Sequence, residues 1–412
     1  MKVKLISYSD AVGGAARAAY RIHRALCSYG LESQMDVGSA SIGDWTVNTP
    51  VGGWAGKIAK LRHPLVRLLT NVLRTESMAL HSPNILPSGW PQRLNQSGAD
   101  IIHLHLMAQE TMSIADIGKL RGPIIWTLHD MWAFCGAEHF TEEFRWRDGY
   151  TRHNRPTYES GFDLNRWTWE RKLKHWRRPM HIVTPSRWLA ECAQQSAVMQ
   201  GWPVSVVPNA IDTDTWMPIE KESARKILRL PSQGPLLLFG AMLGTRDPRK
   251  GFNLLKMALH HLRGQIHGLE LVVLGQHAPK ETADLGFPIH YTGHLNDDVS
   301  LRLYYSAADT VIVPSQQDNL PNCALEAHAC GRPVVAFDVG GLLDIVEHKR
   351  TGYLAKSFDT EDLARGILWT LDDLERHSLL CAESRRSAVE KYSFRAVAEK
   401  YFQVYQAALR GH

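Results

Sequence analysis

The sequence predicts an α/β fold with two doubly wound domains, each built on a parallel sheet between helices. Short apolar runs rich in β-branched residues alternate with helical stretches in both halves of the chain, which is typical of repeated strand–helix–strand units. The length of 412 residues is sufficient for two domains. Glycine turns follow several predicted strands, as at Gly13-Gly14 and Gly293, and such folds bind ligands at the carboxyl ends of their strands.

Composition narrows the class of protein. A hydrophobic fraction of 44% and a charged fraction of 22% are ordinary for a soluble globular chain, and no apolar run reaches the roughly 18 residues that span a membrane. We see no N-terminal targeting signal. The six cysteines lack C-x-x-C spacing, so we expect reduced thiols in a cytoplasmic protein. A net charge of +5 suits anionic small molecules or a membrane surface and is too weak to indicate nucleic acid.

The first predicted strand, Lys2 to Tyr8, leads through Gly13-Gly14 into a good helix-forming stretch. Strand, glycine pair and helix form a phosphate-binding loop in outline. The complete G-x-G-x-x-G fingerprint is missing, which excludes a dinucleotide-dependent dehydrogenase. The alternative is an ordinary strand–helix turn.

A polar pair follows another predicted strand. The strand Pro123 to Leu128 leads directly into His129-Asp130, and polar groups at the carboxyl end of a parallel strand point toward the ligand crevice. We therefore predict a functional role for His129, the alternative being a hydrogen-bonded structural His129–Asp130 pair. For His103 and His105 we predict structural roles.

Two segments of the first half combine basic with apolar or aromatic residues. Residues Lys57 to Arg74 are amphipathic apart from a break at Pro64, so they could lie on an anionic membrane or form a solvated helix face. Residues 135–178 form a long polar and aromatic insertion, with a basic stretch from Asn165 to Arg178. Insertions of this length are usually functional or disordered. We interpret this one as an acceptor-binding or headgroup-contacting element, and a packed helical cap is the alternative.

The most informative stretch lies in the second half. Thr310 to Val313 reads as a buried strand, and a polar loop containing Asp318 precedes a helix in whose first turn we expect Pro321. Glu326 lies inside that helix. The N-terminus of a helix attracts phosphate, and the carboxylates of Asp318 and Glu326 are good acceptors for sugar hydroxyls.

This stretch resembles the donor-binding signature of the family 4 retaining glycosyltransferases, which have the GT-B fold. The match consists of Glu326-Ala327 and Gly331-Arg332-Pro333-Val334-Val335, with Asp318 in place of the first glutamate. Asn319-Leu320-Pro321 stands where the family often has Gly-Phe-Gly, so one backbone donor is lost at the proline.

The resemblance extends to Lys250, which ends the segment Arg246-Asp-Pro-Arg-Lys and matches the lysine that contacts the donor diphosphate. The Gly-Arg that usually precedes it is here Gly240-Ala241. We expect Arg246 or Arg249 to replace the missing arginine. A basic residue at a helix start is otherwise unfavourable to the helix dipole, which favours an anionic ligand here.

The resemblance also implies the organisation of the whole chain. It predicts two Rossmann-like domains facing a cleft: an acceptor-side domain of residues 1–205, with the insertion 135–178, and a donor-binding domain of residues 206–392. The terminal helix, residues 393–412, would pack back on the first domain.

The implied activity is retaining transfer of a sugar from a nucleoside-diphosphate sugar to a hydroxyl of a glycan acceptor. The acceptor would be lipid-linked and belong to cell-surface polysaccharide synthesis, with the enzyme on the inner face of the cytoplasmic membrane. Two alternatives stay open: a GT-B disaccharide phosphorylase or nucleotide-sugar epimerase, and an inactive sugar-nucleotide binding protein.

Roles follow residue by residue from the same resemblance. Lys250 and the amides near Asn322 and Cys323 would hold the diphosphate, Glu326 the ribose, and Asp318 and His129 the transferred sugar. The leaving phosphate would accept the proton, so we expect no cofactor and no metal, and we interpret Asp212-Thr-Asp214 as linker. The other predicted donor-binding residues are Gly13, Gly14, Arg246, Arg249, Gly293, Asn319 and Leu320.

Overall fold

The computed structural model describes residues 1–49, 80–107, 109–240, 247–279, 285–295 and 297–411. The chain divides into two compact units, Met1–Pro208 with Val397–His412, and Asn209–Ala396. The predicted domain borders were 205/206 and 392/393. The amphipathic segment Lys57 to Arg74 and the residues Ala241 and Arg246 lie outside the described residues.

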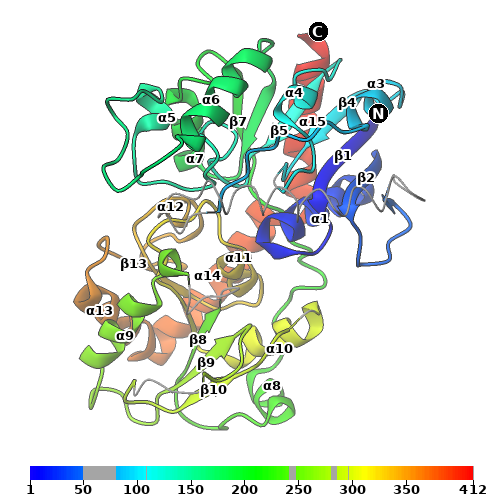
Figure 1. Ribbon diagram of the computed structural model, residues 1–412. Helices are drawn as coiled ribbons and strands as arrows, with labels where there is room; N and C mark the ends of the chain where they lie inside the picture. The colour runs from blue at the N-terminus through cyan, green and yellow to red at the C-terminus, as the bar shows by residue number, and fades with distance from the viewer. Residues whose placement is uncertain (50–79, 108, 241–246, 280–284, 296, 412) are drawn as a thin grey trace. The chain divides into compact units, whose positions relative to one another are not determined.

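Within the described residues, the first unit contains a seven-stranded sheet of order β3-β2-β1-β4-β5-β6-β7, in which each neighbouring pair is parallel (Figure 1). Its elements are β1 (Lys2–Ser9), α1 (Gly13–Ser28), β2 (Glu32–Ser39), β3 (Val47–Asn48), α3 (Trp90–Asn95), β4 (Ile101–Leu104), α4 (Ile114–Ile117), β5 (Ile124–Thr127), α5 (Arg145–Asp148), α6 (Leu164–His175), β6 (His181–Thr184), α7 (Arg187–Gln195) and β7 (Val204–Val206).

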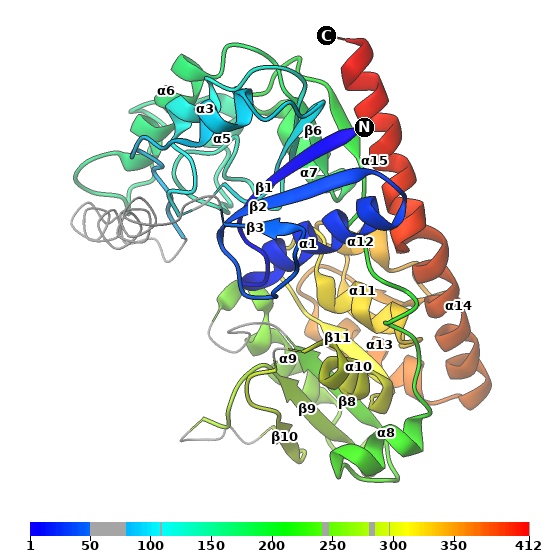
Figure 2. The same ribbon diagram turned by 90° about the vertical axis from the view of Figure 1, so that its right-hand side faces the viewer.

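The second unit contains a six-stranded sheet of order β10-β9-β8-β11-β12-β13 in its described part, again parallel throughout (Figure 2). Its elements are α8 (Lys221–Leu228), β8 (Leu236–Gly240), the 3-10 turn η1 (Pro248–Lys250), α9 (Phe252–His261), β9 (Glu270–Leu274), β10 (Ile289–Tyr291), α10 (Asp298–Ala307), β11 (Thr310–Val313), α11 (Asn322–Ala329), β12 (Val334–Phe337), α12 (Leu342–Ile345), β13 (Gly352–Ala355), α13 (Thr360–Leu371) and α14 (Leu374–Tyr392).

Burial explains why these short apolar runs form strands. Every residue of β11 and of β12 is buried, as expected when helices cover both faces of a parallel sheet. The prediction of two doubly wound α/β domains is confirmed. Because all strands of a sheet run in the same direction, their carboxyl ends share one edge, and that edge carries the loops of interest in each unit.

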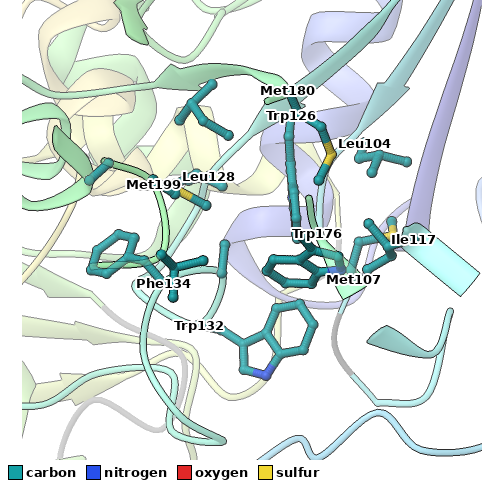
Figure 3. Packing of buried hydrophobic residues seen from close by; sticks show 14 of the residues in the cluster. Leu104, Met107, Ile117, Trp126, Leu128, Trp132, Phe134, Trp176, Met180 and Met199 are labelled. Atoms are coloured by element: carbon teal, nitrogen blue, oxygen red, sulfur yellow. The ribbon is translucent and has the colours of Figure 1, made fainter. Parts of the chain in front are cut away.

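The insertion is part of the hydrophobic core of the first unit. Trp176, just after α6, packs edge-on against Trp126 of β5 and against Trp132, with ring centroids 5.2 and 6.2 Å apart (Figure 3). The side chain of Lys172 is completely buried; it donates to the backbone carbonyls of Trp132, Cys135 and Gly136. The structure thus forms the packed helical cap that the sequence analysis held as an alternative.

This packing corrects one expectation about the basic stretch Asn165 to Arg178. Lys172 cannot contribute a surface charge, and burial lowers the pKa of its ammonium to about 7. The guanidinium of Arg171 is also engaged in hydrogen bonds within the protein, since it donates to the carbonyls of Pro83 and Asn84 at 2.7 and 2.9 Å. The exposed cations of the stretch are Lys174, Arg177 and Arg178.

The terminal helix α15 (Phe394–Arg410) is anchored to the sheet of the first unit. Tyr405 and Tyr401 are fully buried. The Tyr405 hydroxyl lies 2.8 Å from Nδ1 of His103 on β4, and the Tyr401 hydroxyl lies 3.0 Å from Oγ1 of Thr127 on β5. Buried polar groups satisfied in this way fix the position of the helix.

Candidate functional site

In the second unit, the predicted donor-binding residues gather at the carboxyl edge of the sheet. The carboxylate of Asp318, in the loop after β11, lies 2.6 Å from the ammonium of Lys250 in η1. The hydroxyl of Ser315 also donates to this carboxylate, at 3.3 Å. Burial alone would lower the pKa of Lys250, but the charge of Asp318 and the hydrogen bond to it raise that pKa above its ordinary value. Lys250 is therefore a cation at neutral pH.

Backbone contacts hold these two loops together. The Gln316 amide donates to the Arg249 carbonyl at 2.7 Å, and the Gln316 side chain donates to the Pro248 carbonyl at 2.8 Å. Gly251 ends η1 with φ of +68°, and a Cβ there would lie 1.8 Å from the Pro314 carbonyl oxygen. Only glycine permits this approach, which places Lys250 beside Asp318.

A second glycine turn, between β12 and α12, holds the backbone of Asp318. The Gly341 amide donates to the Asp318 carbonyl at 3.0 Å. Gly340 has φ of +53°, and a Cβ there would lie 2.3 Å from the same oxygen. The sequence marks this turn by the glycine pair Gly340-Gly341, which two residues separate from the strand Val334–Phe337.

Helix α11 begins at Asn322, with Pro321 in the N-cap position rather than in the first turn where we expected it. Pro321 provides no side-chain cap, so the helix start relies on backbone contacts and on the dipole that attracts anions. Asn209 braces this start, because its Nδ2 lies 3.3 Å from both the Leu320 carbonyl and the Asn322 side-chain oxygen. Burial raises the pKa of the Cys323 thiol to about 12, so it stays protonated.

Glu326 lies in α11 with little exposure, and one of its carboxylate oxygens accepts from the hydroxyl of Tyr305 at 3.0 Å. Burial, together with the charge of Glu326, raises the pKa of Tyr305 well above its ordinary value. The phenol therefore remains a donor and orients the carboxylate.

The other predicted donor-binding residues of this unit differ in their contacts and in their exposure to solvent. Arg249 forms an ion pair with Asp247 at 2.7 Å. Gly293 has φ of +69° and lies against the ring of His277, while its amide donates to the Gln276 carbonyl at 2.9 Å. The loops after β9 and β10 are thus joined at the same carboxyl edge. Asn319 and Leu320 are buried.

In the first unit, the glycine loop has the predicted form. The Ser9 hydroxyl accepts from the amides of Ala11 and Val12, each at 3.2 Å. Gly13 has φ of +87° and begins α1, followed by Gly14. The loop turns sharply at the carboxyl end of β1, next to the central strand β4.

His129 follows β5 at the same edge of this sheet. Its Nε2 lies 3.1 Å from Nδ1 of His105, and the two rings are stacked with centroids 5.4 Å apart. Burial lowers the pKa of His129 to about 4, partly opposed by the charge of Asp130. The imidazole is neutral at pH 7 and can serve as a hydrogen-bonding group.

Asp130 does not form the structural pair with His129 that we held as an alternative. Its carboxylate instead accepts from Nδ1 of His139, at 2.6 Å, and Nε2 of His139 contacts the Ser82 hydroxyl at 2.8 Å. His139 is separated from Asp130 by nine positions of irregular chain, so local sequence could not identify this partner.

His105 lies closer to the site than its predicted structural role implied. It lines a small pocket together with His129, Asp130, Trp132 and His139. Its Nε2 is buried and has no hydrogen-bond partner among the described residues. His103 matches its structural role, since both of its ring nitrogens are engaged, by Tyr405 and Thr127. The His-x-His spacing was the only signal that linked the two histidines.

The Asp212-Thr-Asp214 segment forms a local turn. Asp212 accepts from the amides of Asp214 and Thr215 and from the Thr215 hydroxyl. Its carboxylate is thereby occupied by its own chain.

None of the helices in the described part of the chain combines the length and the apolar character needed to cross a membrane.

Comparison with known families agrees with this geometry. The profile described as Glycosyltransferase Family 4 matches residues 12–215, and the profile described as Glycosyl transferases group 1 matches residues 234–373. The chain belongs to glycosyltransferase family 4. The resemblance inferred from Asp318, Glu326 and Lys250 is confirmed at the level of the family.

Individual relatives match less completely. The lipopolysaccharide 1,2-N-acetylglucosaminetransferase of Salmonella typhimurium is 30% identical over 53% of this chain and 60% of its own length. Two solved structures match this chain over nearly its whole length. Sucrose-phosphate synthase from Thermosynechococcus elongatus covers 100% of both chains, with a TM-score of 0.66 and 18% identity. Anabaena Alr3699/HepE in complex with UDP-glucose covers 99% of this chain and 100% of that one, with a TM-score of 0.65 and 15% identity. The predicted GT-B fold class is confirmed.

Proposed function

We propose that this protein transfers a sugar from a nucleoside-diphosphate sugar to a hydroxyl of a glycan acceptor, with retention of configuration at the anomeric carbon. The observation that carries the proposal is the Lys250–Asp318 pair beside the start of α11, with Glu326 one helical turn further on. These groups combine a cation and a helix N-terminus for a diphosphate with two carboxylates for hydroxyl groups.

In this mechanism the diphosphate leaves as the bond to the sugar breaks. Lys250 and the positive end of α11 stabilise the charge that develops on it, which is the main catalytic effect. Asp318 and the neutral His129 bind hydroxyls of the sugar and orient it. The leaving phosphate oxygen accepts the proton of the acceptor hydroxyl, so the reaction needs neither a dedicated protein base nor a metal ion.

Lys250 has two roles in this scheme. Without donor, its charge is balanced by Asp318 at 2.6 Å. An arriving diphosphate competes for the same ammonium and frees the carboxylate to accept from sugar hydroxyls. Binding of the diphosphate and of the sugar is thereby coupled through one ion pair.

For the acceptor we propose a lipid-linked glycan in cell-surface polysaccharide synthesis. The similarity to a lipopolysaccharide N-acetylglucosaminetransferase supports this assignment. The exposed cations Lys174, Arg177 and Arg178 at the end of α6 would bring the enzyme to the anionic cytoplasmic surface where such acceptors are held.

The test is calorimetric titration with UDP-glucose, UDP-N-acetylglucosamine, GDP-mannose and ADP-glucose, followed by product analysis. We expect one donor to bind and its sugar to appear on a lipid-linked or oligosaccharide acceptor with the original anomeric configuration. Phosphate-dependent turnover, or isomerisation of the donor without acceptor, would instead identify a phosphorylase or an epimerase. Absence of binding by every donor would refute the proposal.

A further inference from the structure

The two ring nitrogens of His105 have different surroundings. Nδ1 lies 3.1 Å from Nε2 of His129, whereas Nε2 of His105 is buried without a hydrogen-bond partner among the described residues. His105 is 2% exposed, while His129 is half-buried, and both rings line the same small pocket. His129 is therefore the accessible member of the pair, and His105 is the member enclosed by the protein.

The position of His105 is fixed by its neighbours. His105 directly follows β4, and its amide donates to the Ile6 carbonyl of β1 at 2.9 Å. Its own carbonyl accepts from the indole of Trp126 at 3.1 Å. His103, two positions earlier in the extended chain, points to the same face of the sheet, and the two rings have centroids 4.1 Å apart. Since His103 is bonded to the Tyr405 hydroxyl of α15, the ring of His105 rests on a part of the core that is itself held in place.

A hydrogen bond between two imidazole rings requires one ring to donate and the other to accept. Burial lowers the pKa of His129 to about 4 and that of His105 well below its ordinary value, so both rings are neutral at pH 7. Each neutral ring carries one proton. Two arrangements are then possible: His105 donates from Nδ1, or His129 donates from Nε2.

The unpartnered Nε2 of His105 decides between the two arrangements. If His129 donated, His105 would accept at Nδ1 and carry its proton at Nε2. That arrangement would bury an N–H group with no acceptor among the described residues. If His105 donates, its Nε2 carries only a lone pair. A buried acceptor without a partner is tolerated more often than a buried N–H group without one, so donation by His105 is favoured.

The proton on His105 dictates the tautomer of His129. A neutral imidazole that accepts at Nε2 carries its own proton at Nδ1, because the hydrogen bond made by one ring nitrogen sets the state of the other. His129 would then offer a sugar hydroxyl an N–H donor at Nδ1. A ring that is already held in one tautomer and one orientation loses less freedom when it binds a ligand.

We propose that His105 is a positioning residue for His129: it donates from Nδ1 to Nε2 of His129 and thereby fixes the orientation of that ring and its Nδ1-protonated tautomer. This inference rests on the proposed function, in which His129 binds the transferred sugar, and adds to it the residue that directs this histidine. His105 acts through His129 and does not itself bind the sugar.

The first measurement is 15N NMR of the full-length deuterated protein, labelled in its histidine rings and free of ligand at pH 7. His129→Gln assigns the signals of His129 by their loss. We expect Nδ1 of His129 to be protonated and Nε2 to be unprotonated, and the Nε2-protonated form to appear in His105→Leu. A protonated Nε2 of His129 in the wild type would overturn the inference and leave the proposed function standing.

The second measurement is turnover of the nucleotide-sugar that the donor titration selects. Asparagine places its amide nitrogen near the position of histidine Nδ1, whereas glutamine places it near that of Nε2. We therefore expect His105→Asn to retain most of kcat and His105→Gln and His105→Leu to lower kcat about tenfold, as for one lost hydrogen bond. Donor affinity should change little, because the residues proposed to hold the nucleotide are unaltered. His181→Asn, at the first residue of β6 and bonded to Ser205, is the matched control and should retain kcat.

The order of the variants separates positioning from packing. Glutamine is closer to histidine in volume than asparagine is, so a role in packing alone would make His105→Asn the more damaging change. That order, or an equal kcat in wild type, His105→Gln and His105→Leu, would overturn the positioning role. Thermal denaturation shows which variants fold, and the tautomer of the wild type decides the inference if they do not. Absence of donor binding by the wild type would refute the proposed function and the positioning role with it.

Discussion

The ammonium of Lys250 lies 2.6 Å from the carboxylate of Asp318, although 68 positions separate the two residues in the chain. Each belongs to a loop at the carboxyl edge of the second sheet, and contacts from Gln316 to Arg249 and Pro248 hold the loops together. In the absence of donor, this ion pair satisfies both charges. It also ties the residue proposed to bind the diphosphate to the residue proposed to bind the sugar.

Replacing Lys250 by alanine should weaken donor binding about 10- to 150-fold, the equivalent of about 1.5–3 kcal/mol for one lost charge-assisted contact. The unpaired Asp318 would in addition repel the diphosphate. Calorimetry with the nucleotide-sugar that the donor titration selects measures the change. Lys250→Ala/Asp318→Ala should recover part of the loss, and Lys226→Ala, at an exposed lysine of α8, is the matched cationic control. Equal affinity in wild type and Lys250→Ala would remove Lys250 from the site.

Glu326→Gln should reduce affinity for the complete nucleotide-sugar while having little effect on binding of inorganic diphosphate, because the carboxylate is assigned to the ribose. Tyr305→Phe removes the hydroxyl that orients this carboxylate at 3.0 Å, so it should produce a smaller loss of the same kind. Thermal denaturation checks that both variants fold. Equal losses for nucleotide-sugar and diphosphate would contradict the ribose assignment.

Turnover should be independent of divalent metal, because the proposed mechanism uses Lys250 and the start of α11 to stabilise the leaving diphosphate. Donor consumption in the presence of acceptor should be nearly unchanged by excess EDTA. Magnesium or manganese added back serves as the control. Complete inhibition by the chelator, reversed by either ion, would show that the diphosphate is held by a metal.

Acidification should destabilise the protein partly through His103. Burial lowers the pKa of this fully buried histidine to about 3, against about 6.5 in an unfolded chain. The unfolded state therefore binds the extra proton. The contribution of His103 to the free energy of unfolding is fully present above pH 6.5 and is lost as the pH drops from 6.5 toward 3. Between pH 6.5 and 5, protonation of this histidine in the unfolded chain should lower the free energy of unfolding by about 2 kcal/mol.

Urea denaturation at pH 7, 6 and 5 measures this effect. His103→Gln should be less stable than wild type at pH 7, because the hydrogen bonds to Tyr405 and Thr127 are disturbed, but its stability should fall less between pH 7 and 5. Parallel pH profiles for the two proteins would mean that His103 does not contribute to acid sensitivity.

Association with anionic vesicles should depend on the exposed cations Lys174, Arg177 and Arg178, each contributing about 1 kcal/mol near the surface. Sedimentation with phosphatidylglycerol vesicles should show binding at low salt that weakens at high salt and is lost when the three charges are reversed. Reversing Lys226, Arg229 and Lys349, exposed in the second unit, changes the net charge equally and should have less effect. Equal loss in both variants would indicate a response to net charge alone.

Local sequence was sufficient to predict much of the second unit. The apolar runs of β11 and β12, the polar loop between β11 and α11 and the placement of Glu326 within that helix were all predicted from residue type and spacing. A buried parallel strand needs a continuous apolar run, and a helix starts where proline and polar residues interrupt that run. Such constraints act over a few residues, so a sequence pattern contains them.

Partners distant in the chain were decided by tertiary structure. The composition of the basic stretch Asn165 to Arg178 is typical of a solvent-exposed surface, yet Lys172 is buried. Three backbone carbonyls between Trp132 and Gly136 accept hydrogen bonds from its ammonium. Asp130 pairs with His139 rather than with its neighbour His129. Residue type establishes that a buried charge needs a partner, but only the packed fold determines which partner is within reach.

The same distinction applies to Trp45, which is 90% exposed. Its sequence neighbours gave no sign of exposure, because an indole is ordinarily a core residue. The structure leaves it in solvent because Asp10 and Asp44, on either side, hold the loop to the end of β1 and to α1. Sequence alone predicted the fold class, since this depends on periodicity and composition, and its motifs carried the resemblance to family 4. The depth of each side chain depended on contacts between segments far apart in the chain, and only the tertiary structure decided it.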